Sequence, residues 1–170
     1  MGNERYIGAP NGIVLCVDGL NQQGCFGCFY HAYTRDAVNF SSLGEMLFRM
    51  EAFFDGLNFP RRGNSARSFA ETELTGHGGD RGAHAQERRE RIMSDQELLG
   101  RHGQQETFII RVQHRQNNTW QGRITWADKN KTLTFRSIWE MVHLMESALY
   151  EDADPDEVPV IQSWEEEDVD

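Results

Sequence analysis

Three cysteines and a histidine lie close together near the start of the chain, where they could form a metal site. Cys25 and Cys28 have the spacing of two zinc ligands, His31 follows three residues later, and Cys16 precedes them. Thiolates and imidazole are ligands that zinc prefers, so this set could complete a tetrahedron. Alternation along a β-strand, however, sends Cys25 and Cys28 to opposite faces. We therefore predict reduced thiols, no metal site and no cofactor.

No other combination of residues indicates catalysis. None of the six histidines stands beside a visible nucleophile, and the sequence carries neither a glycine-rich phosphate loop nor a zinc-binding helix motif. We predict that the protein is not an enzyme and that it has no catalytic residue.

A cationic face is predicted in the second half of the chain. Alternation of polar and apolar residues places several basic side chains on the outward face of a hairpin and at its next turn: Arg111, Arg115, Arg123, Lys129 and Lys131. Such groups could contact phosphates. Aromatic side chains for base stacking are missing from the same face, and a solvated sheet face explains the pattern equally well. Nucleic-acid binding by this hairpin is therefore one alternative.

The corresponding face in the first half of the chain is apolar, which makes it a candidate partner surface. Its outward positions include Val14, Cys16, Phe26, Cys28 and Tyr30. An apolar face must be covered by linker residues of this chain, by a second subunit or by another protein, and all three alternatives stay open. Two tryptophans are further candidates for partner contact, namely Trp139 on a helix and Trp164 in the C-terminal tail.

The elements that position these residues occur twice in the chain. Residues 14–55 and 109–150 align without a gap at a constant offset of 95, and nine aligned positions are identical, including Gly27 with Gly122 and Glu51 with Glu146. Two copies of one supersecondary unit are the simplest interpretation.

Each unit is predicted to contain three strands and a helix. Alternating apolar residues predict strands, and Asn-rich segments such as 116–119 predict the turns between them. Ser42 with Glu45 and Ser137 with Glu140 form capping boxes, each followed by an apolar stripe at helical spacing. The fold class is therefore α+β, a pseudo-two-fold tandem repeat of a β-β-β-α unit, in which two amphipathic helices cover one side of an antiparallel sheet or of two adjoining sheets.

The domain organisation follows from these units. Residues 1–150 form a single domain with a first unit (about 10–60), a mobile Arg-rich linker (about 61–105) and a second unit (about 106–150). Within the linker, Ser94 and Glu97 predict a short helix.

Charge is concentrated at the end of the chain. Of the 27 acidic residues ten lie in residues 151–170, so the remaining 150 residues carry 17 acidic and 17 basic side chains. We interpret residues 151–170 as an acidic tail that stays disordered when free, and that could bind a basic partner surface or the linker. No apolar run is long enough to span a membrane or to act as a secretory signal, so we expect a cytoplasmic protein.

Two segments of the second unit resemble a known group of proteins. RVQHRQNNTWQGRITW and FRSIWEMVHLMESAL look like a family of small uncharacterised proteins from clostridial bacteria. This resemblance implies a bacterial protein and brings no function with it.

Three functions remain open from the sequence. The first is a non-enzymatic protein-interaction or regulatory module that binds a protein partner and is able to form a homodimer. The second is a protein inhibitor of a nucleic-acid enzyme, such as an anti-CRISPR protein, with the acidic tail in place of phosphates. The third is nucleic-acid binding through the cationic hairpin.

Overall fold

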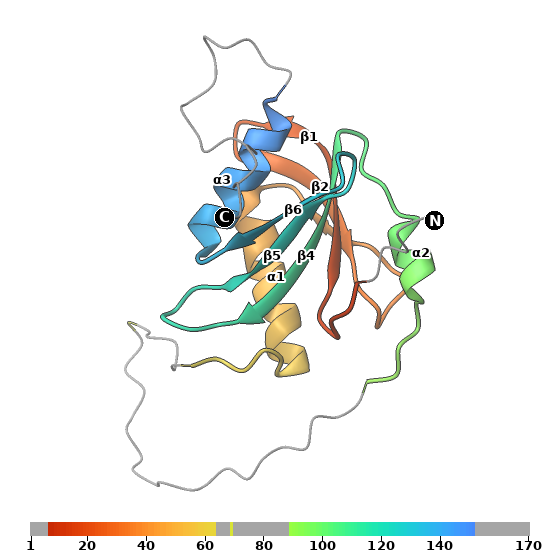
Figure 1. Cartoon of the computed structure of the whole chain (residues 1–170), viewed down its shortest axis with the longest axis vertical. Coiled ribbons are helices and arrows are strands. Elements are labelled where there is room, and N and C mark those ends of the chain that lie inside the picture. Colours follow the sequence, from red (N-terminus) through yellow and green to blue (C-terminus); the bar gives the residue numbers. More distant parts are fainter. Residues whose placement is uncertain (1–6, 64–68, 70–88, 152–170) are drawn as a thin grey trace, which may run out of the picture.

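The strand-forming segments build one six-stranded antiparallel sheet with helices on both faces (Figure 1). The structure is a computed structural model that describes residues 7–63, 69 and 89–151. The elements occur in the order β1 (Ile13–Asn21), β2 (Gly24–Tyr30), β3 (Val38–Phe40), α1 (Leu43–Leu57), α2 (Asp95–Leu99), β4 (Glu106–His114), β5 (Gln121–Trp126), β6 (Lys131–Phe135) and α3 (Ile138–Leu149). The α+β class is thereby confirmed.

The strands lie in the order β3-β2-β1-β4-β5-β6, with β1 and β4 side by side at the centre. Val14 pairs with Ile109 across this central seam. One residue is bulged out of β1 between Val17 and Gly19, and one out of β4 between Val112 and His114. Each of these positions in the first half differs by 95 from its counterpart in the second half.

Two glycines lie where neighbouring strands approach too closely for a side chain. A Cβ atom on Gly27 would lie 2.0 Å from the carbonyl oxygen of Cys16, and one on Gly122 would lie 2.1 Å from that of Arg111. Such distances are far below van der Waals contact, so only glycine fits these two positions.

The helix starts are confirmed where the sequence predicts them. The Ser42 side chain caps α1 by accepting from the backbone N–H of Glu45, and Ser137 caps α3 by accepting from that of Glu140. The predicted short helix α2 is also present, and Ser94 and Glu97 form its capping box.

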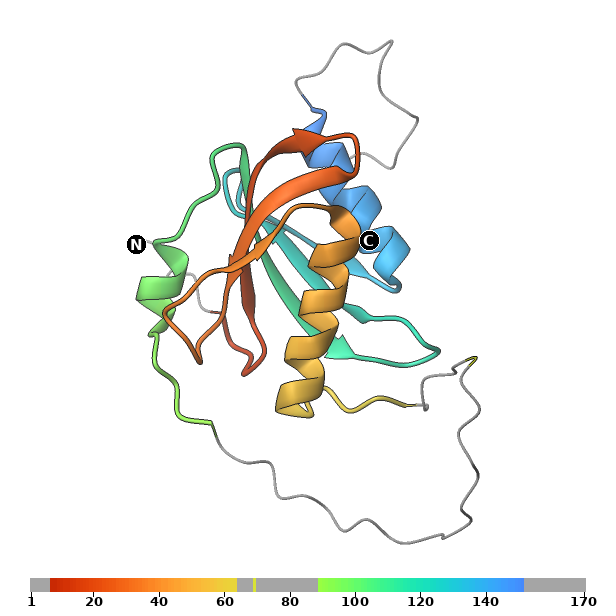
Figure 2. The same ribbon diagram turned by 180° about the vertical axis from the view of Figure 1, so that it is seen from behind.

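The main core lies between the sheet and the pair α1 and α3, which cover one face (Figure 2). Met46, Met50 and Phe54 of α1 are fully buried there, as are Met141 and Met145 of α3. We call this the helix face of the sheet and the opposite one the outer face. A smaller core on the outer face lies under α2 and includes Leu98 and Met93.

Candidate functional site

The most unusual buried group is the guanidinium of Arg115, which lies on the helix face. Val112 pairs with Gly122 and His114 pairs with Gln121, so Gln113 is the extra residue of a β-bulge. A bulge reverses the alternation of side chains beyond it. Arg115 therefore points to the same face as Val112, and only 4% of the residue is exposed. The prediction that Arg115 belongs to the outward cationic face is wrong.

Arg115 joins the C-terminal half of α1 to the loop that follows it. Its Nη1 lies 2.7 Å from Oδ1 of Asp55 and 3.4 Å from Oε1 of Glu51, while its Nε donates to the carbonyl oxygen of Pro60 at 2.7 Å. Arg62 binds the same two acids, with Nη2 2.6 Å from Glu51 and 2.8 Å from Asp55. The two arginines and two acids form one compact ion cluster.

The electrostatics of this cluster favour the charged states of Asp55 and Arg62, and a hydrogen bond with Asp55 raises the pKa of Arg62. Burial opposes ionisation of Asp55, but hydrogen bonds from Arg62 and Arg115 outweigh it and lower the pKa of its carboxyl group. Glu51 also accepts a hydrogen bond of 2.6 Å from the indole Nε1 of Trp120. These contacts fix Trp120 and Arg62 as rigid walls of the space beside them.

That space is a cavity of about 560 Å³ between α1, the first residue of α3 and the β4–β5 hairpin. We call it the apolar cavity, because aliphatic and aromatic side chains form most of its wall and charged groups lie only on one side. Its lining residues are Gly44, Leu47, Phe48, Glu51, Arg62, Arg115, Asn118, Thr119, Trp120 and Ile138. The volume lies within the range of sites that bind small molecules or anchoring side chains.

A second hollow of about 470 Å³ shares Arg62 and Arg115 with the apolar cavity. We call it the arginine hollow, because three arginines line it and no carboxylate does. Its lining residues are Asn58, Phe59, Pro60, Arg61, Arg62, Gly63, Gln113, His114, Arg115 and Gln116. An apolar site thus continues directly into a polar hollow, where Arg62 and Arg115 are paired with Glu51 and Asp55 and Arg61 is exposed.

The corresponding place in the other half of the sheet is closed. There the pocket has a volume of only about 20 Å³, between β1, β2, the start of α1 and the C-terminal half of α3. Leu20 takes the place of Arg115, Cys25 that of Trp120, and Glu146 that of Glu51, each at an offset of 95. The open cavity therefore comes with polar residues that the closed one lacks.

Phe48 and Gly44 mark the mouth of the apolar cavity. Phe48 is 80% exposed although it is a large aromatic residue, and a Cβ atom built on Gly44 would meet nothing within 4 Å. Sequence reasoning missed Phe48, Arg62 and Trp120 as site residues. The signal that could have indicated this region is the identity of Glu51 and Glu146, two acids beside apolar helix stripes.

The other predicted cationic residues divide between the two faces. Arg111 and Arg123 lie opposite each other on the outer face. Lys131 pairs with Trp126, whose side chain is in the main core, so Lys131 is on the helix face. Lys129 lies over the Trp126 ring and forms an ion pair with Glu151. The predicted single face of five cations is therefore corrected to a pair, because register places the lysines on the other side.

The apolar outer face of the first unit is covered by this chain itself. Val14 and Cys16 are each 1% exposed and pack with Leu98 of α2, Met93 and Ile7. The expectation that these two residues are available to a partner is corrected, because α2 occupies the place. Cys28 and Tyr30 are partly buried beside the same cluster, and Phe26 is 38% exposed.

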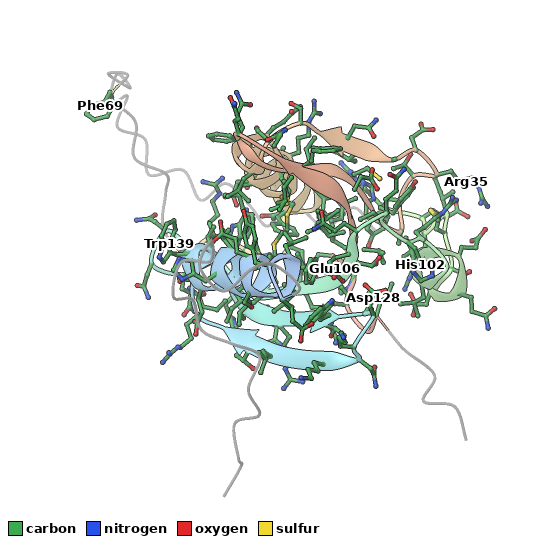
Figure 3. All side chains as sticks on the ribbon, turned by 90° about the horizontal axis from the view of Figure 1, so that it is seen from above. Arg35, Phe69, His102, Glu106, Asp128 and Trp139 are labelled. Carbon is green, nitrogen blue, oxygen red and sulfur yellow. The ribbon has the colours of Figure 1, made fainter. Side chains whose placement is uncertain are left out.

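Trp139 remains open to solvent on α3. It is 70% exposed (Figure 3), and its ring lies tilted against that of His143 with centroids 4.6 Å apart. Trp164, the other predicted contact tryptophan, lies outside the described residues together with residues 152–170.

The cysteines cannot converge on one ion. Cys25 lies in the core on the helix face, whereas Cys16 and Cys28 face each other across β1 and β2 on the outer face. Burial raises the pKa of Cys25 to about 11, and burial together with the neighbouring Cys28 raises that of Cys16 to about 12. His31 is also packed rather than free, stacked on Phe53 with ring centroids 4.1 Å apart.

The structure brings together one pair of carboxyl groups that sequence reasoning missed. Glu106 and Asp128 lie side by side near the β5–β6 turn (Figure 3). Burial and the adjacent Asp128 raise the pKa of Glu106, although a hydrogen bond from Trp126 opposes the shift. Within the part of the chain that the structure describes, no group of three or more acidic, histidine or cysteine side chains could hold a metal ion.

No protein-family model matches the chain, and neither a curated protein nor a solved structure is significantly similar to it. The resemblance to clostridial proteins stays a prediction. Among residues 7–63 and 89–151, no helix has both the length and the apolar character needed to cross a bilayer.

Proposed function

We propose that the protein is a non-enzymatic protein-interaction module whose binding site is the apolar cavity together with the arginine hollow. The partner is a protein segment in which an aromatic or large aliphatic side chain is followed directly by acidic residues. The apolar side chain occupies the cavity, and the carboxylates that follow it reach the arginine hollow.

The observation that carries this proposal is the continuity of the two hollows through Arg62 and Arg115. A buried apolar anchor contributes about 1.5–3 kcal/mol to binding. Arg62 keeps a third of its side chain exposed, and Arg61 is exposed as well, so both can pair with carboxylates at the surface. The ion cluster and the Trp120–Glu51 hydrogen bond organise the walls before a partner arrives.

Selection of random peptides on the full-length chain tests the proposal. The immobilised chain carries Trp164→Ala, because Trp164 and the acids that follow it have the same pattern as the expected peptides and would compete with them for the site. We expect enrichment of peptides in which Trp, Phe or Leu is followed by two or more acids, and affinity that weakens as salt rises, because exposed charge pairs are screened.

The variant Gly44→Leu closes the cavity without risk to the fold. Its side chain enters open space, and leucine is more favourable than glycine in a helix by about 1 kcal/mol. Selected peptides should bind this variant more than about tenfold more weakly. The matched control is Ala52→Leu, which adds the same side chain to an exposed position of α1 outside both hollows. Equal binding to both variants, or enrichment without acids, contradicts the proposal.

A second candidate function is binding of nucleic acid at Arg111 and Arg123. Like charges directly opposite each other on a sheet repel, and burial together with Arg123 lowers the pKa of Arg111. Among the residues that the structure describes, none forms a hydrogen bond with the buried Nε of Arg111. A phosphate between the two guanidinium groups would relieve both conditions. Fluorescence anisotropy with single-stranded DNA and RNA tests this, and Arg123→Gln should weaken binding and reduce its salt dependence.

We also propose that the two units are tandem copies of one β-β-β-α unit. Equal spacing of the bulges, the capped helix starts, and the glycines at 27 and 122 supports this, since each pair differs by 95 residues. In this view the second copy of the hairpin and the first copy of the helix diverged together to open the apolar cavity.

A further inference from the structure

We infer that the C-terminal segment of this same chain, centred on Trp164, occupies the apolar cavity in the absence of a partner. The inference rests on the proposed function, because it assigns a resident occupant to that site. Trp164 fills the apolar cavity, and the acids that follow it pair with the arginine hollow. The module is then closed by its own tail, and a partner must displace it.

The chemistry of the segment matches the two hollows in order. Trp164 is followed at once by Glu165, Glu166, Glu167 and Asp168. The site presents an apolar cavity and, next to it, a hollow where the exposed Arg61 and the exposed third of the Arg62 side chain can be reached by carboxylates. An aromatic residue followed by four negative charges is the pattern that this arrangement complements.

The described surface contains what such a segment would cover. Phe48, at the mouth of the cavity, is 80% exposed, although aromatic residues of this size are usually covered. On the other half of the sheet, the corresponding place is closed by the packing of α1 and α3 and needs no occupant.

The length of chain suits the distance. Ile138 lies at the cavity and Glu151 follows the far end of α3, so about 18 Å of helix separates them. Thirteen residues lead from Glu151 to Trp164, a length that can extend to about 45 Å. The prolines and acidic residues of this segment favour extended conformations, so a segment of this length bridges the distance without being fully stretched. Attachment to the same chain raises the effective concentration of the segment at the cavity.

The described chain ends on the same face of the sheet as the cavity. Glu151, the last described residue, forms an ion pair with Lys129 at 3.7 Å on the helix face. No crossing to the outer face is required.

The experiment is fluorine NMR on the full-length chain labelled with 5-fluorotryptophan. The chain has four tryptophans, and the Trp164 resonance is identified by its loss in Trp164→Phe. We expect this resonance to lie away from the position of a free peptide of residues 152–170. Gly44→Leu should return it to the free position, whereas Ala52→Leu should leave it shifted.

A Trp164 resonance at the free position in the unaltered chain would overturn the inference. A shift that grows with protein concentration would also overturn it, because the occupant would then be the tail of a second copy. As a second measurement, a peptide selected on the Trp164→Ala chain should bind the unaltered chain about tenfold more weakly. If such peptides bind both chains equally, the tail is not a competitor, while the proposed function stands. If no peptide binds either chain but the Trp164 resonance is shifted, the tail occupies the cavity and the proposed function is contradicted.

Discussion

At the scale of single residues, the position of Arg115 shows how a buried charge can shape a cavity. Its guanidinium is almost fully enclosed, yet each of its partners is a carboxylate or a backbone carbonyl. Removing one member of such a cluster leaves the desolvated remainder with fewer opposite charges around it. The cluster therefore holds α1, the loop after it and the β4–β5 hairpin in one arrangement.

Replacing Arg115 tests this role. Arg115→Leu, which introduces the residue found at position 20, should lower the free energy of unfolding by about 2–3 kcal/mol. This is less than for a fully buried pair, because the Asp55 side chain is 46% exposed. Urea unfolding measures the loss. Arg123→Leu on the outer face should change stability by less than about 0.5 kcal/mol, and a similar loss in both variants would contradict the role.

A second residue governs stability below neutral pH. Burial, with a contribution from Arg89, lowers the pKa of His31 to about 4 from its usual 6.5. The folded protein therefore keeps this ring neutral while the unfolded chain takes up a proton, and stability present above pH 6.5 is lost as pH falls towards 4.

Between pH 7.5 and pH 5.5 this loss should amount to about 1.4 kcal/mol. His31→Phe keeps an aromatic ring against Phe53 and should lack that part of the pH dependence. Glu45 and Glu97, with pKa values of about 2, act only below pH 4.5. The raised pKa of Glu106 increases stability as pH falls, and this contribution is the same in the unaltered protein and in His31→Phe. Urea unfolding of both proteins at the two pH values provides the test. An equal loss of unfolding free energy in both proteins would refute the role of His31.

At the scale of elements, the glycine positions set how closely the strands approach. Gly27 and Gly122 face the carbonyl oxygens of Cys16 and Arg111, just before the bulge of each neighbouring strand. A side chain there would push the strands apart at the point where Asp18 and Gln113 leave the ladder.

We expect Gly122→Ala to cost more than about 3 kcal/mol, because the obstacle is backbone and cannot rotate away. Gly44→Ala is the contrasting change, since its Cβ meets open space and alanine favours a helix by about 1 kcal/mol. Thermal unfolding should show a large fall in Tm for the first and none for the second. A small change in Gly122→Ala would mean that the strands separate easily at this point.

At the scale of the whole molecule, features that depend on residues close together in the sequence were predicted correctly, and features that depend on distant residues were not. Ser42 and Ser137 predicted both helix starts because an N-cap serine accepts from the residue three positions on. The reciprocal half of each predicted capping box differs, because Glu45 and Glu140 accept from the N–H groups of Ser41 and Arg136, one residue before the cap. The side of Arg115 was not predictable, because a bulge appears only once two strands are paired. The side of Lys131 depends on its register with Trp126. The apolar cavity is space left between three distant segments, and no single segment encodes it.

The cover of the outer face illustrates the same limit. Three occupants were open for the apolar face of β1 and β2, and the choice of α2 depends on where the chain places residues 93–99 in space. Leu98 and Met93 are ordinary apolar residues of a polar linker, and their burial follows only from the tertiary fold.

The pairing of β1 with β4 at the centre of the sheet has a consequence for a polypeptide that contains only the first half of the chain. Because Val14 faces Ile109 with the strands antiparallel, each strand of the seam meets its own counterpart head to tail. A polypeptide limited to residues 7–60 would leave the hydrogen-bonding edge of β1 bare, and the best match for that edge is the same edge on a sister molecule. Two such half-proteins would rebuild a symmetric six-stranded sheet, so we expect this polypeptide to form a homodimer.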